Sequence, residues 1–546
     1  MMYTVIIMVF ALFLYFPAIG SAAPVGNGPP PTEVKSTDAP APLFSPVNAQ
    51  TQADAAIVRD REIVRSRRVV IDLNLLPRSA DRQTGGIATA SVISLNLFDD
   101  VNFVAEADRV ERTSRGMAWV GRLRGIDLSQ VVIIVNGDVV AGNISMPEGR
   151  YHIRFVGKGV HEVQEIDQSL FPQEAEPIEP PRLQEPNDQS SLQKKDTQTY
   201  DDGSTIDVMV VYSATTRAAA GGNAAILAQI DLAVLETNQS YQNSGIAQRL
   251  RLVHSEEVAY TETGSIDQAL DCITYATDGC LDHIQALRNT YGADIVSFWI
   301  ENDPNYCGVA WMMTTVSSSF SSWGFSAVKR SCATGVYSFG HEMGHNMGAD
   351  HDVYVTSNNL PYPYAHGYTY TATASPWRTM MAYNDACIAA GTSCTRIPYW
   401  SNPSISYGGV AMGNATADNQ QALDNTAFTV ASFRASVSTE TVAASFASEG
   451  LWVYNPISAT WAQVSPYIPE NTIYSGSTLY GDFGTIGLWK RDGTVWTELT
   501  SSNVETMVAS GSTLYGDFGA LGLWSWNGTV WTELASDNPI TMAVSN

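Results

Sequence analysis

The early part of the chain contains short apolar runs separated by turn residues. These runs lie at 68–73, 90–95, 131–135 and 151–156, and Gly, Asn and Asp punctuate the stretches between them. Runs of this length that are rich in Val and Ile are typical of β-strands. We therefore predict a β-rich domain over residues 51–165.

The central part has a different pattern, in which strand-like and helix-like segments alternate. The apolar run Ile206–Tyr212 predicts a buried strand, and residues 224–241 have apolar positions at a helical period. Further segments of these two kinds follow at 249–253, 281–291 and 294–300. Such an order is typical of an α/β (α+β) sheet with crossover connections. We predict one domain of this class over residues 205–437, which makes the chain multidomain.

The C-terminal part is built from a repeat of 35 residues. The sequence SGSTLYGDFGTIGLW from Ser475 recurs from Ser510 with two changes, and a weaker copy contains Gly450. Each unit has room for about four short strands, the content of one propeller blade. We predict an all-β module of three repeats over 438–546. Its recurring tryptophans are expected in the core first, and as platforms for a carbohydrate or other surface ligand second: Trp452, Trp461, Trp489, Trp496, Trp524 and Trp531.

The remaining segments have the composition of leaders and linkers. Val5–Phe16 is an apolar run of 12 residues, which is too short to span a bilayer and predicts a signal peptide over 1–22 that is cut after Ala22. A wrongly assigned start or a buried helix is the alternative. Residues 23–50 are rich in Pro, Ala, Ser and Thr and predict a disordered lead. Residues 166–204 predict a flexible, Pro-rich acidic linker in which a processing cut is expected. No later run is long enough for a transmembrane segment.

Charge and composition narrow the partners. The chain has 546 residues, of which 30 are Lys or Arg and 55 are Asp or Glu, so its net charge is −25. This balance argues against nucleic acid and anionic membrane as partners, because both need a basic surface. Residues 51–165 hold 15 basic and 15 acidic side chains, whereas residues 201–546 hold 11 and 31. The contrast suggests that the two parts dock, although surface charge often serves only solvation.

Six cysteines lie between 272 and 394, and an even number in an exported chain predicts three disulfides with 15 pairings. Short spacing favours Cys272–Cys280 and Cys387–Cys394, which leaves Cys307–Cys332. A zinc cluster is the alternative, but the chain has no CxxC spacing to support it.

The segment His341-Glu-Met-Gly-His345-Asn-Met-Gly348-Ala-Asp-His351 carries the chemistry. Two histidines four residues apart share one face of a helix and can chelate one Zn²⁺. Gly348 favours a turn with positive φ that ends the helix and brings His351 round as a third ligand. Three protein ligands leave one position for water, as in catalytic zinc sites.

Glu342 follows the first of these histidines and is expected to face the water side of the metal. A carboxylate there can take a proton from the attacking water and return it to the leaving amine. The other histidines of the central part, His254, His283 and His366, are isolated and are expected to be ordinary surface or core residues.

HEMGHNMGADHD resembles the zinc motif of the metzincin metalloendopeptidases, HExxHxxGxxH. Asp352, directly after the third histidine, resembles the reprolysin (adamalysin/ADAM-like) branch. The resemblance covers 205–437 and implies a twisted mixed sheet with helices above the cleft and a smaller lobe below. Tyr306–Met312 resembles the edge strand along the substrate cleft. Arg378–Tyr383 resembles the Met-turn, which would put Met381 beneath the zinc.

Two departures from the family pattern matter. Tyr383 stands where astacins and serralysins carry a tyrosine that acts as a mobile zinc ligand or oxyanion donor, although reprolysins generally lack it; ordinary packing is the alternative. Residues 24–200 contain no cysteine, so the propeptide thiol that silences other metzincins is absent. Inhibition is then expected from another ligand or from steric blockage.

We predict a secreted, extracellular zinc endopeptidase, made as a proenzyme and acting on proteins or peptides. One alternative is a binding or adhesion protein with an inactive metzincin domain, which the intact Glu342 and the three histidines disfavour. Another alternative is a zinc hydrolase of non-peptide amides, which the motif's chemistry permits.

Overall fold

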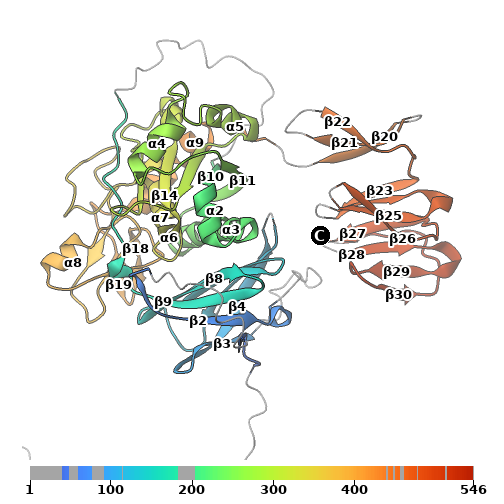
Figure 1. Cartoon of the computed structure of the whole chain (residues 1–546), viewed down its shortest axis with the longest axis horizontal. Helices are drawn as coiled ribbons and strands as arrows, with labels where there is room; N and C mark the ends of the chain where they lie inside the picture. Colours follow the sequence, from blue (N-terminus) through green and yellow to red (C-terminus); the bar gives the residue numbers. More distant parts are fainter. Residues whose placement is uncertain are drawn as a thin grey trace, which may run out of the picture. The chain divides into compact units, whose positions relative to one another are not determined.

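The structure is a computed structural model, and Figure 1 shows the whole chain. It describes residues 40–47, 60–76, 92–113, 115–181, 203–437, 441–446, 449–455, 460–475, 478–492, 494–510 and 513–544. The predicted signal peptide with its cut after Ala22, and the Lys194-Lys195 pair of the predicted linker, lie outside these residues.

A sheet dominates the early part of the described chain. Its strands pair in the order β1-β2-β9-β8-β7-β6-β5-β4-β3, and every neighbouring pair is antiparallel. The strands are β1 (Phe44–Pro46), β2 (Ile63–Ile71), β3 (Val92–Phe98), β4 (Val101–Arg112), β5 (Met117–Leu123), β6 (Gln130–Asn136), β7 (Val139–Met146), β8 (Gly149–Gly157) and β9 (Val160–Ile166). Connections between sequence neighbours explain the run from β3 to β9, since consecutive strands usually pair. The pair β2–β9 is the exception, and it places β3 at the opposite edge of the sheet.

Strand β1 corrects the expectation of a disordered lead over 23–50. Phe44–Pro46 pairs with β2, and Leu43 and Phe44 are buried. The prediction rested on average composition, and two adjacent apolar side chains that fill a core outweigh it locally.

The central part contains a second, mixed sheet in the order β11-β10-β12-β14-β13. Its strands run parallel except for β13, which is antiparallel to β14 and forms one edge. These strands are β10 (Thr205–Ser213), β11 (Arg249–Val258), β12 (Ile295–Ile300), β13 (Gly308–Ala310) and β14 (Phe325–Lys329). The associated helices are α2 (Ala214–Ala220), α3 (Asn223–Asn243), α4 (Ile266–Thr274), α5 (Ile284–Tyr291), α6 (Arg330–Ala333), α7 (Ser338–Asn346), α8 (Asp385–Ala389) and α9 (Asn419–Ala431).

Short strands complete the part that follows α7. They are β15 (Thr369–Tyr370), β16 (Trp377–Arg378), β17 (Thr395–Arg396), β18 (Asn402–Tyr407) and β19 (Val410–Met412). A small aromatic cluster around Trp377 and Tyr407 packs between them. This part therefore contains two small sheets, β15-β16-β17 and β18-β19, and no large one among its described residues.

Helix α3 joins the two sheets. The alternate residues Val131 and Ile133 of β6 lie in the core of the first sheet, whereas Val132 and Ile134 lie in the core of the mixed-sheet part. Helix α3 packs on β6 and β7 from that second side (Figure 1). Both faces of the first sheet are therefore buried at its centre, which explains why these strands read as nearly continuous apolar runs.

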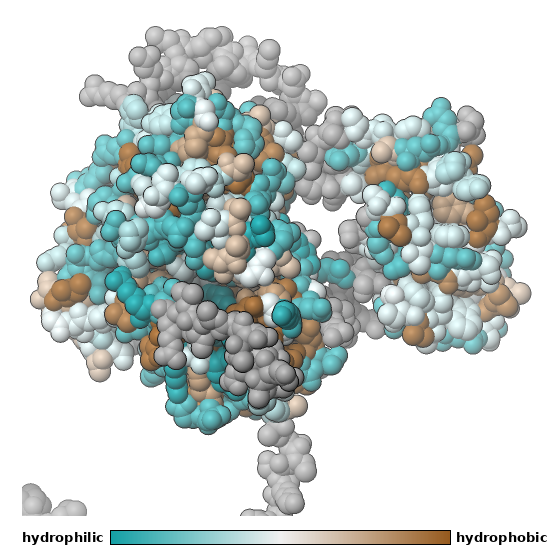
Figure 2. Space-filling view, in the orientation of Figure 1, coloured by the Kyte–Doolittle hydropathy of each residue, from teal (hydrophilic) through white to brown (hydrophobic). Residues whose placement is uncertain are grey.

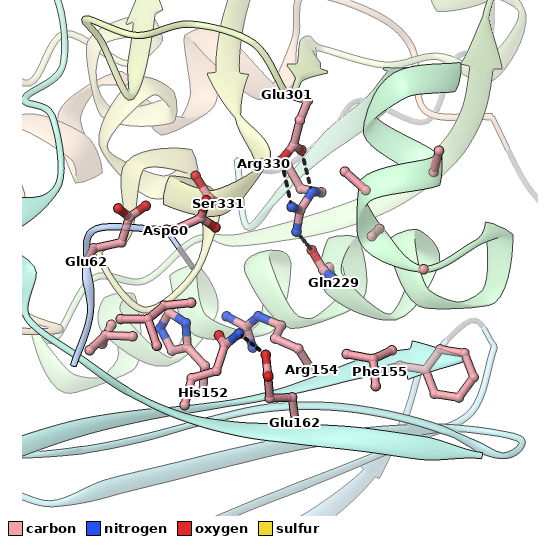
Figure 3. A pocket seen from close by; sticks show the side chains of 18 of the residues that line it. Asp60, Glu62, His152, Arg154, Phe155, Glu162, Gln229, Glu301, Arg330 and Ser331 are labelled. Atoms are coloured by element: carbon pink, nitrogen blue, oxygen red, sulfur yellow. Dashed lines mark hydrogen bonds and ion pairs between the residues drawn. The ribbon is translucent and has the colours of Figure 1, made fainter. Parts of the chain in front are cut away.

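Polar contacts accompany this packing. Arg115 of the first sheet pairs with Asp231 of α3 at 2.7 Å, and Asn143 donates to the Glu236 carboxylate at 2.7 Å. A cavity of about 400 Å³ is lined by residues of both parts, among them Arg154 of β8 and Gln229 of α3, and Figure 3 shows Arg330 reaching to Glu301 there. The Arg115–Asp231 pair is thus one point where a basic side chain of the early part meets an acidic one of the central part.

Three disulfide bonds join Cys272 to Cys280, Cys307 to Cys332 and Cys387 to Cys394, and none of the six cysteines is left free within 203–437. These are the pairs that the sequence spacing favours. The second bond ties the residue before β13 to α6, close to the start of α7.

Removing the Cys307–Cys332 bond should destabilise the central part selectively. The double variant Cys307→Ala/Cys332→Ala should lose about 2–5 kcal/mol of unfolding free energy, the usual effect of removing a native bridge from an exported domain. Urea unfolding followed by tryptophan fluorescence measures this change. An unchanged midpoint, or mass mapping that finds six free thiols in the purified chain, would contradict the pairing.

The repeats form separate antiparallel sheets. The first described unit contains β20 (Val442–Phe446), β21 (Gly450–Asn455) and β22 (Thr460–Ser465). The second contains β23 (Asn471–Ser475), β24 (Thr478–Asp482), β25 (Leu488–Asp492) and β26 (Val495–Thr500). The third contains β27 (Thr506–Ser510), β28 (Thr513–Asp517), β29 (Leu523–Trp526) and β30 (Trp531–Ala535). Leu488, Val504 and Leu514 form a small core shared by the second and third units.

Candidate metal centre

Helix α7 and the turn after it bring three histidines together. His341 and His345 lie one turn apart on α7, and Gly348 has φ +84° and reverses the chain beyond the helix end. The amide of Gly348 donates to the carbonyl of His345 at 3.0 Å. His351 follows this turn and faces the other two histidines, as the sequence predicts.

The three Nε2 atoms converge on one point. They lie 3.1–3.2 Å from one another, and all three side chains are completely buried. Three nitrogens around a tetrahedral Zn²⁺ at about 2.05 Å would be roughly 3.3 Å apart. The spacing therefore fits one zinc ion.

Hydrogen bonds at the other ring nitrogens support this reading. Nδ1 of His341 lies 2.9 Å from the carbonyl oxygen of Met380, and Nδ1 of His345 lies 2.9 Å from that of Ala349. A carbonyl accepts only, so each Nδ1 carries the proton and each Nε2 presents its lone pair. Burial lowers the pKa of His341 to about 3 and that of His345 well below 6.5, which keeps both rings neutral. Neutral imidazole is the form that ligates metal.

Glu342 lies beside this cluster and against strand β13. Its side chain is fully buried, and neither carboxylate oxygen has a hydrogen-bond partner among the described residues. A Cβ built on Gly308 would come within 2.3 Å of its Oε1, so any larger residue there would displace the Glu342 carboxylate from this position. Burial raises the pKa of Glu342 well above 4.5, and the neighbouring carboxylate of Glu174 adds to the effect. An unpaired buried carboxylate in such a place is typical of a functional site.

The Met-turn packs beneath the histidines. A Cβ on Gly344 would lie 2.7 Å from the sulfur of Met381, so this glycine lets α7 rest directly on Met381. Asp352 links the turn to the third histidine, because its carboxylate accepts from the amide of Tyr383 at 2.9 Å and from that of Tyr354 at 3.1 Å. Met381 and Asp352 thus fix where His351 and Tyr383 lie.

Tyr383 lies close to the metal site. Its ring centroid is 4.0 Å from that of His351, and its hydroxyl donates to the carbonyl of Glu174 at 2.8 Å. Its role as zinc ligand or oxyanion donor stays a prediction, because the hydroxyl is engaged with the segment before residue 205.

The segment 173–178 lies along β13 and corrects part of the linker expectation. Residues 166–204 are predicted to be flexible, yet Glu174 and Ala175 are buried, and the amide of Ala175 donates to the carbonyl of Gly308 at 2.8 Å. Glu174 and its buried partner Arg396 are not among the site residues predicted from the sequence. Their spacing of 222 residues leaves no local signal that could have linked them.

The isolated histidines do not join the cluster. His254 stacks on Tyr291 with ring centroids 3.7 Å apart, and His283 precedes α5. Nδ1 of His366 lies 2.8 Å from the carbonyl oxygen of His351, so it helps to hold the backbone of the third histidine.

The repeats carry two equivalent apolar hollows of about 210 and 270 Å³. Each is lined by a phenylalanine, two tryptophans and an aliphatic residue at matching repeat positions: Phe483, Ile486, Trp489 and Trp496 in one, Phe518, Leu521, Trp524 and Trp531 in the other. Tyr467 and Val495 of the module are exposed. Figure 2 shows hydrophobic side chains at the surface of this module.

The mixed sheet, the helix-borne HExxH pair and the third histidine after a glycine turn define a metzincin-type metallopeptidase. A family model described as Metallo-peptidase family M12 (Reprolysin_5) matches residues 202–401. Three curated relatives, each named peptidyl-Asp metalloendopeptidase, support the same placement. The chain belongs to this reprolysin-like M12 family and is a zinc metalloendopeptidase.

The relatives come from different bacteria. The Xanthomonas campestris protein is 35% identical over 395 residues, which cover 71% of this chain and 87% of that protein. The Stenotrophomonas maltophilia protein is 40% identical over 311 residues, covering 56% and 71%. The Pseudomonas fragi protein is 37% identical over 199 residues, covering 36% of this chain and all of that protein.

Among the described residues, no single helix is long and apolar enough to cross a membrane. The bent pair of α2 and α3 passes the same test of length and composition when its two helices are taken together.

Proposed function

We propose that the chain is a secreted proenzyme of an endopeptidase in which Glu342 is the general base. The observation that carries the proposal is the convergence of three buried histidine Nε2 atoms beside a buried carboxylate that has no partner among the described residues, next to the edge strand of a mixed sheet. The names of the relatives support peptide substrates cut at aspartate.

His341, His345 and His351 would hold the zinc, which when bound supplies Lewis-acid polarisation and lowers the pKa of water. Glu342 then accepts the proton of the attacking water at its carboxylate and delivers it to the nitrogen of the leaving amine. Strand β13 would hold the substrate backbone, because its outer edge presents amide and carbonyl groups to an extended peptide once residues 173–178 have left it.

We propose the order signal peptide (1–22), lead (23–50), β-rich prodomain (51–165), linker (166–204), catalytic domain (205–437) and repeat module (438–546). The support for latency is the position of residues 173–178. They lie on β13, and the Glu176 carboxylate is 3.5 Å from Nδ1 of His351. A substrate would need the same edge, so the segment excludes it.

Processing should cut the chain between residues 182 and 204. A cut there lets 173–178 leave with the prodomain, whereas a cut before Gln173 would keep the segment tethered to the cleft. The mature chain should have a mass near 37 kDa, scaled from the whole chain. N-terminal sequencing of the active exported form tests this. An active enzyme that still begins near Ala23 would show that residues 24–181 are a permanent part of the enzyme and not a propeptide.

We propose that the repeat module binds a carbohydrate through its two aromatic hollows, where a ring can stack on a tryptophan face. Soluble oligosaccharides should quench the tryptophan fluorescence of the chain, and Trp489→Ala with Trp524→Ala should abolish most of the quenching. The double variant Trp452→Ala with Trp461→Ala serves as control, because these tryptophans line neither hollow. Equal quenching in both double variants would contradict this assignment.

A further inference from the structure

Residues 173–178 add a strand to the open edge of the mixed sheet. The amide of Ala175 donates to the carbonyl of Gly308 at 2.8 Å, and the amide of Cys307 donates to the carbonyl of Gln173 at 2.9 Å. Further along, the amide of Ile178 donates to the carbonyl of Ala310, and the amide of Met312 donates to the carbonyl of Ile178, both at 2.9 Å. This is β-augmentation, the way in which an extended peptide binds a sheet edge. The chain therefore holds a peptide of its own in the place of a substrate.

One side chain of this peptide enters a closed, charged pocket. The Glu174 carboxylate makes two hydrogen bonds to the Arg396 guanidinium, at 2.5 and 2.7 Å, and accepts a third from the Ser338 hydroxyl at 2.7 Å. Its side chain is 2% exposed and that of Arg396 is 3% exposed. Paired donors of this kind are the geometry by which arginine reads a carboxylate.

The pocket adjoins the reacting groups. Ser338 is the first residue of α7, three positions before His341 and four before Glu342. The backbone carbonyls of Glu174 and Ala175 accept from the Tyr383 hydroxyl, whose ring lies over His351. A residue whose side chain fills this pocket has its own backbone beside the metal site, so it neighbours the bond to be cut.

The pocket needs an anion. Arg396 is held from the protein side by the carbonyl of Val336 at 2.9 Å, and the half-buried Arg378 adds positive charge nearby. Among the described residues, the only ion-pair partner of the Arg396 guanidinium is Glu174. The guanidinium therefore loses this partner once residues 173–178 leave. A buried, unpaired cation is costly, so an acidic side chain of a substrate gains more there than a neutral one.

We propose that Arg396, with Ser338, is the receptor for the acidic side chain next to the scissile bond, and that Glu174 fills it in the uncleaved chain as a built-in substrate mimic. The inference rests on the proposed endopeptidase function and deepens it. Arg396 is then the residue that selects the substrate, and its contact with Glu174 keeps the proenzyme inactive.

The specificity arm uses the processed chain and two fluorogenic peptides that differ only in one Asp or Asn. Wild type should prefer the Asp peptide in kcat/KM by roughly 10- to 100-fold, the worth of hydrogen bonds to a charged group. Arg396→Gln should bring this ratio close to one by slowing the Asp peptide only, and Ser338→Ala should lower it a few-fold. Arg217→Gln, an exposed arginine paired with Glu257, is the matched control and should keep the ratio. An unchanged ratio in Arg396→Gln would overturn the inference.

The latency arm uses the full chain. Glu174→Gln should raise the activity before processing at least about tenfold, because the neutral amide leaves the Arg396 charge unpaired. Glu179→Gln makes the same change at an exposed residue directly after the segment 173–178, and this variant should stay inactive before processing. Equal latency in both variants would overturn the mimic.

A third readout does not need turnover. A synthetic peptide of residues 172–179 should bind the processed chain in calorimetry, and its Glu174→Gln form should bind at least about tenfold more weakly. Equal affinities would overturn the inference. A processed wild type that binds the peptide but cuts no substrate would instead defeat the proposed function and leave the recognition by Arg396 standing.

Discussion

Glu342→Gln should reduce kcat of the processed chain by about 10²- to 10⁴-fold, the usual contribution of a positioned general base. The amide has the shape of the carboxylate and fits against Gly308, but it cannot take a proton from water. The three histidines are untouched, so zinc should stay bound at one ion per chain. KM should change little, since the loss concerns the transition state.

Two measurements accompany this variant. Zinc content by atomic absorption separates loss of the base from loss of the metal, and Glu498→Gln, an exposed glutamate of the repeat module, controls for the charge change. A Glu342→Gln enzyme that digests substrate at nearly the wild-type rate would show that another group moves the proton.

His345→Ala should remove zinc and activity together. It leaves two ligands, and a catalytic zinc site needs three from the protein. The lost imidazole also leaves the carbonyl of Ala349 without its partner, so the turn to His351 should loosen. His254→Ala, which changes a histidine outside the cluster, is the matched control. Full zinc content in His345→Ala would place the metal elsewhere.

The sequence predicts the metal centre well because its parts are local. All three histidines, Glu342 and Gly348 fall within eleven residues, and one helix and one turn fix their geometry. The long helix is also predicted closely: 224–241 is expected and α3 spans Asn223–Asn243. The helix expected from Leu281 begins later, at Ile284, because Leu281 has a positive φ of 53° and belongs to a turn.

The sequence does not predict contacts that depend on the whole fold. Glu174 has the surroundings of a linker residue, with Pro172 and Pro177 on either side, and Arg396 lies in a short strand without a motif. They meet because the segment 173–178 lies along β13 and because the carbonyl of Val336, just before α7, holds the Arg396 guanidinium. The same holds for Phe44, whose burial accompanies its pairing with Ile71 of β2, 27 residues further along the chain.

The most direct test of the central claim is digestion of casein by the processed chain, with and without a zinc chelator. We expect the wild-type processed chain to digest casein, the chelator to abolish this proteolysis, and added Zn²⁺ to restore it. Glu342→Gln should show no such proteolysis under any of these conditions. Proteolysis that persists in the chelator, or its absence from the processed wild-type chain with zinc bound, would contradict the account.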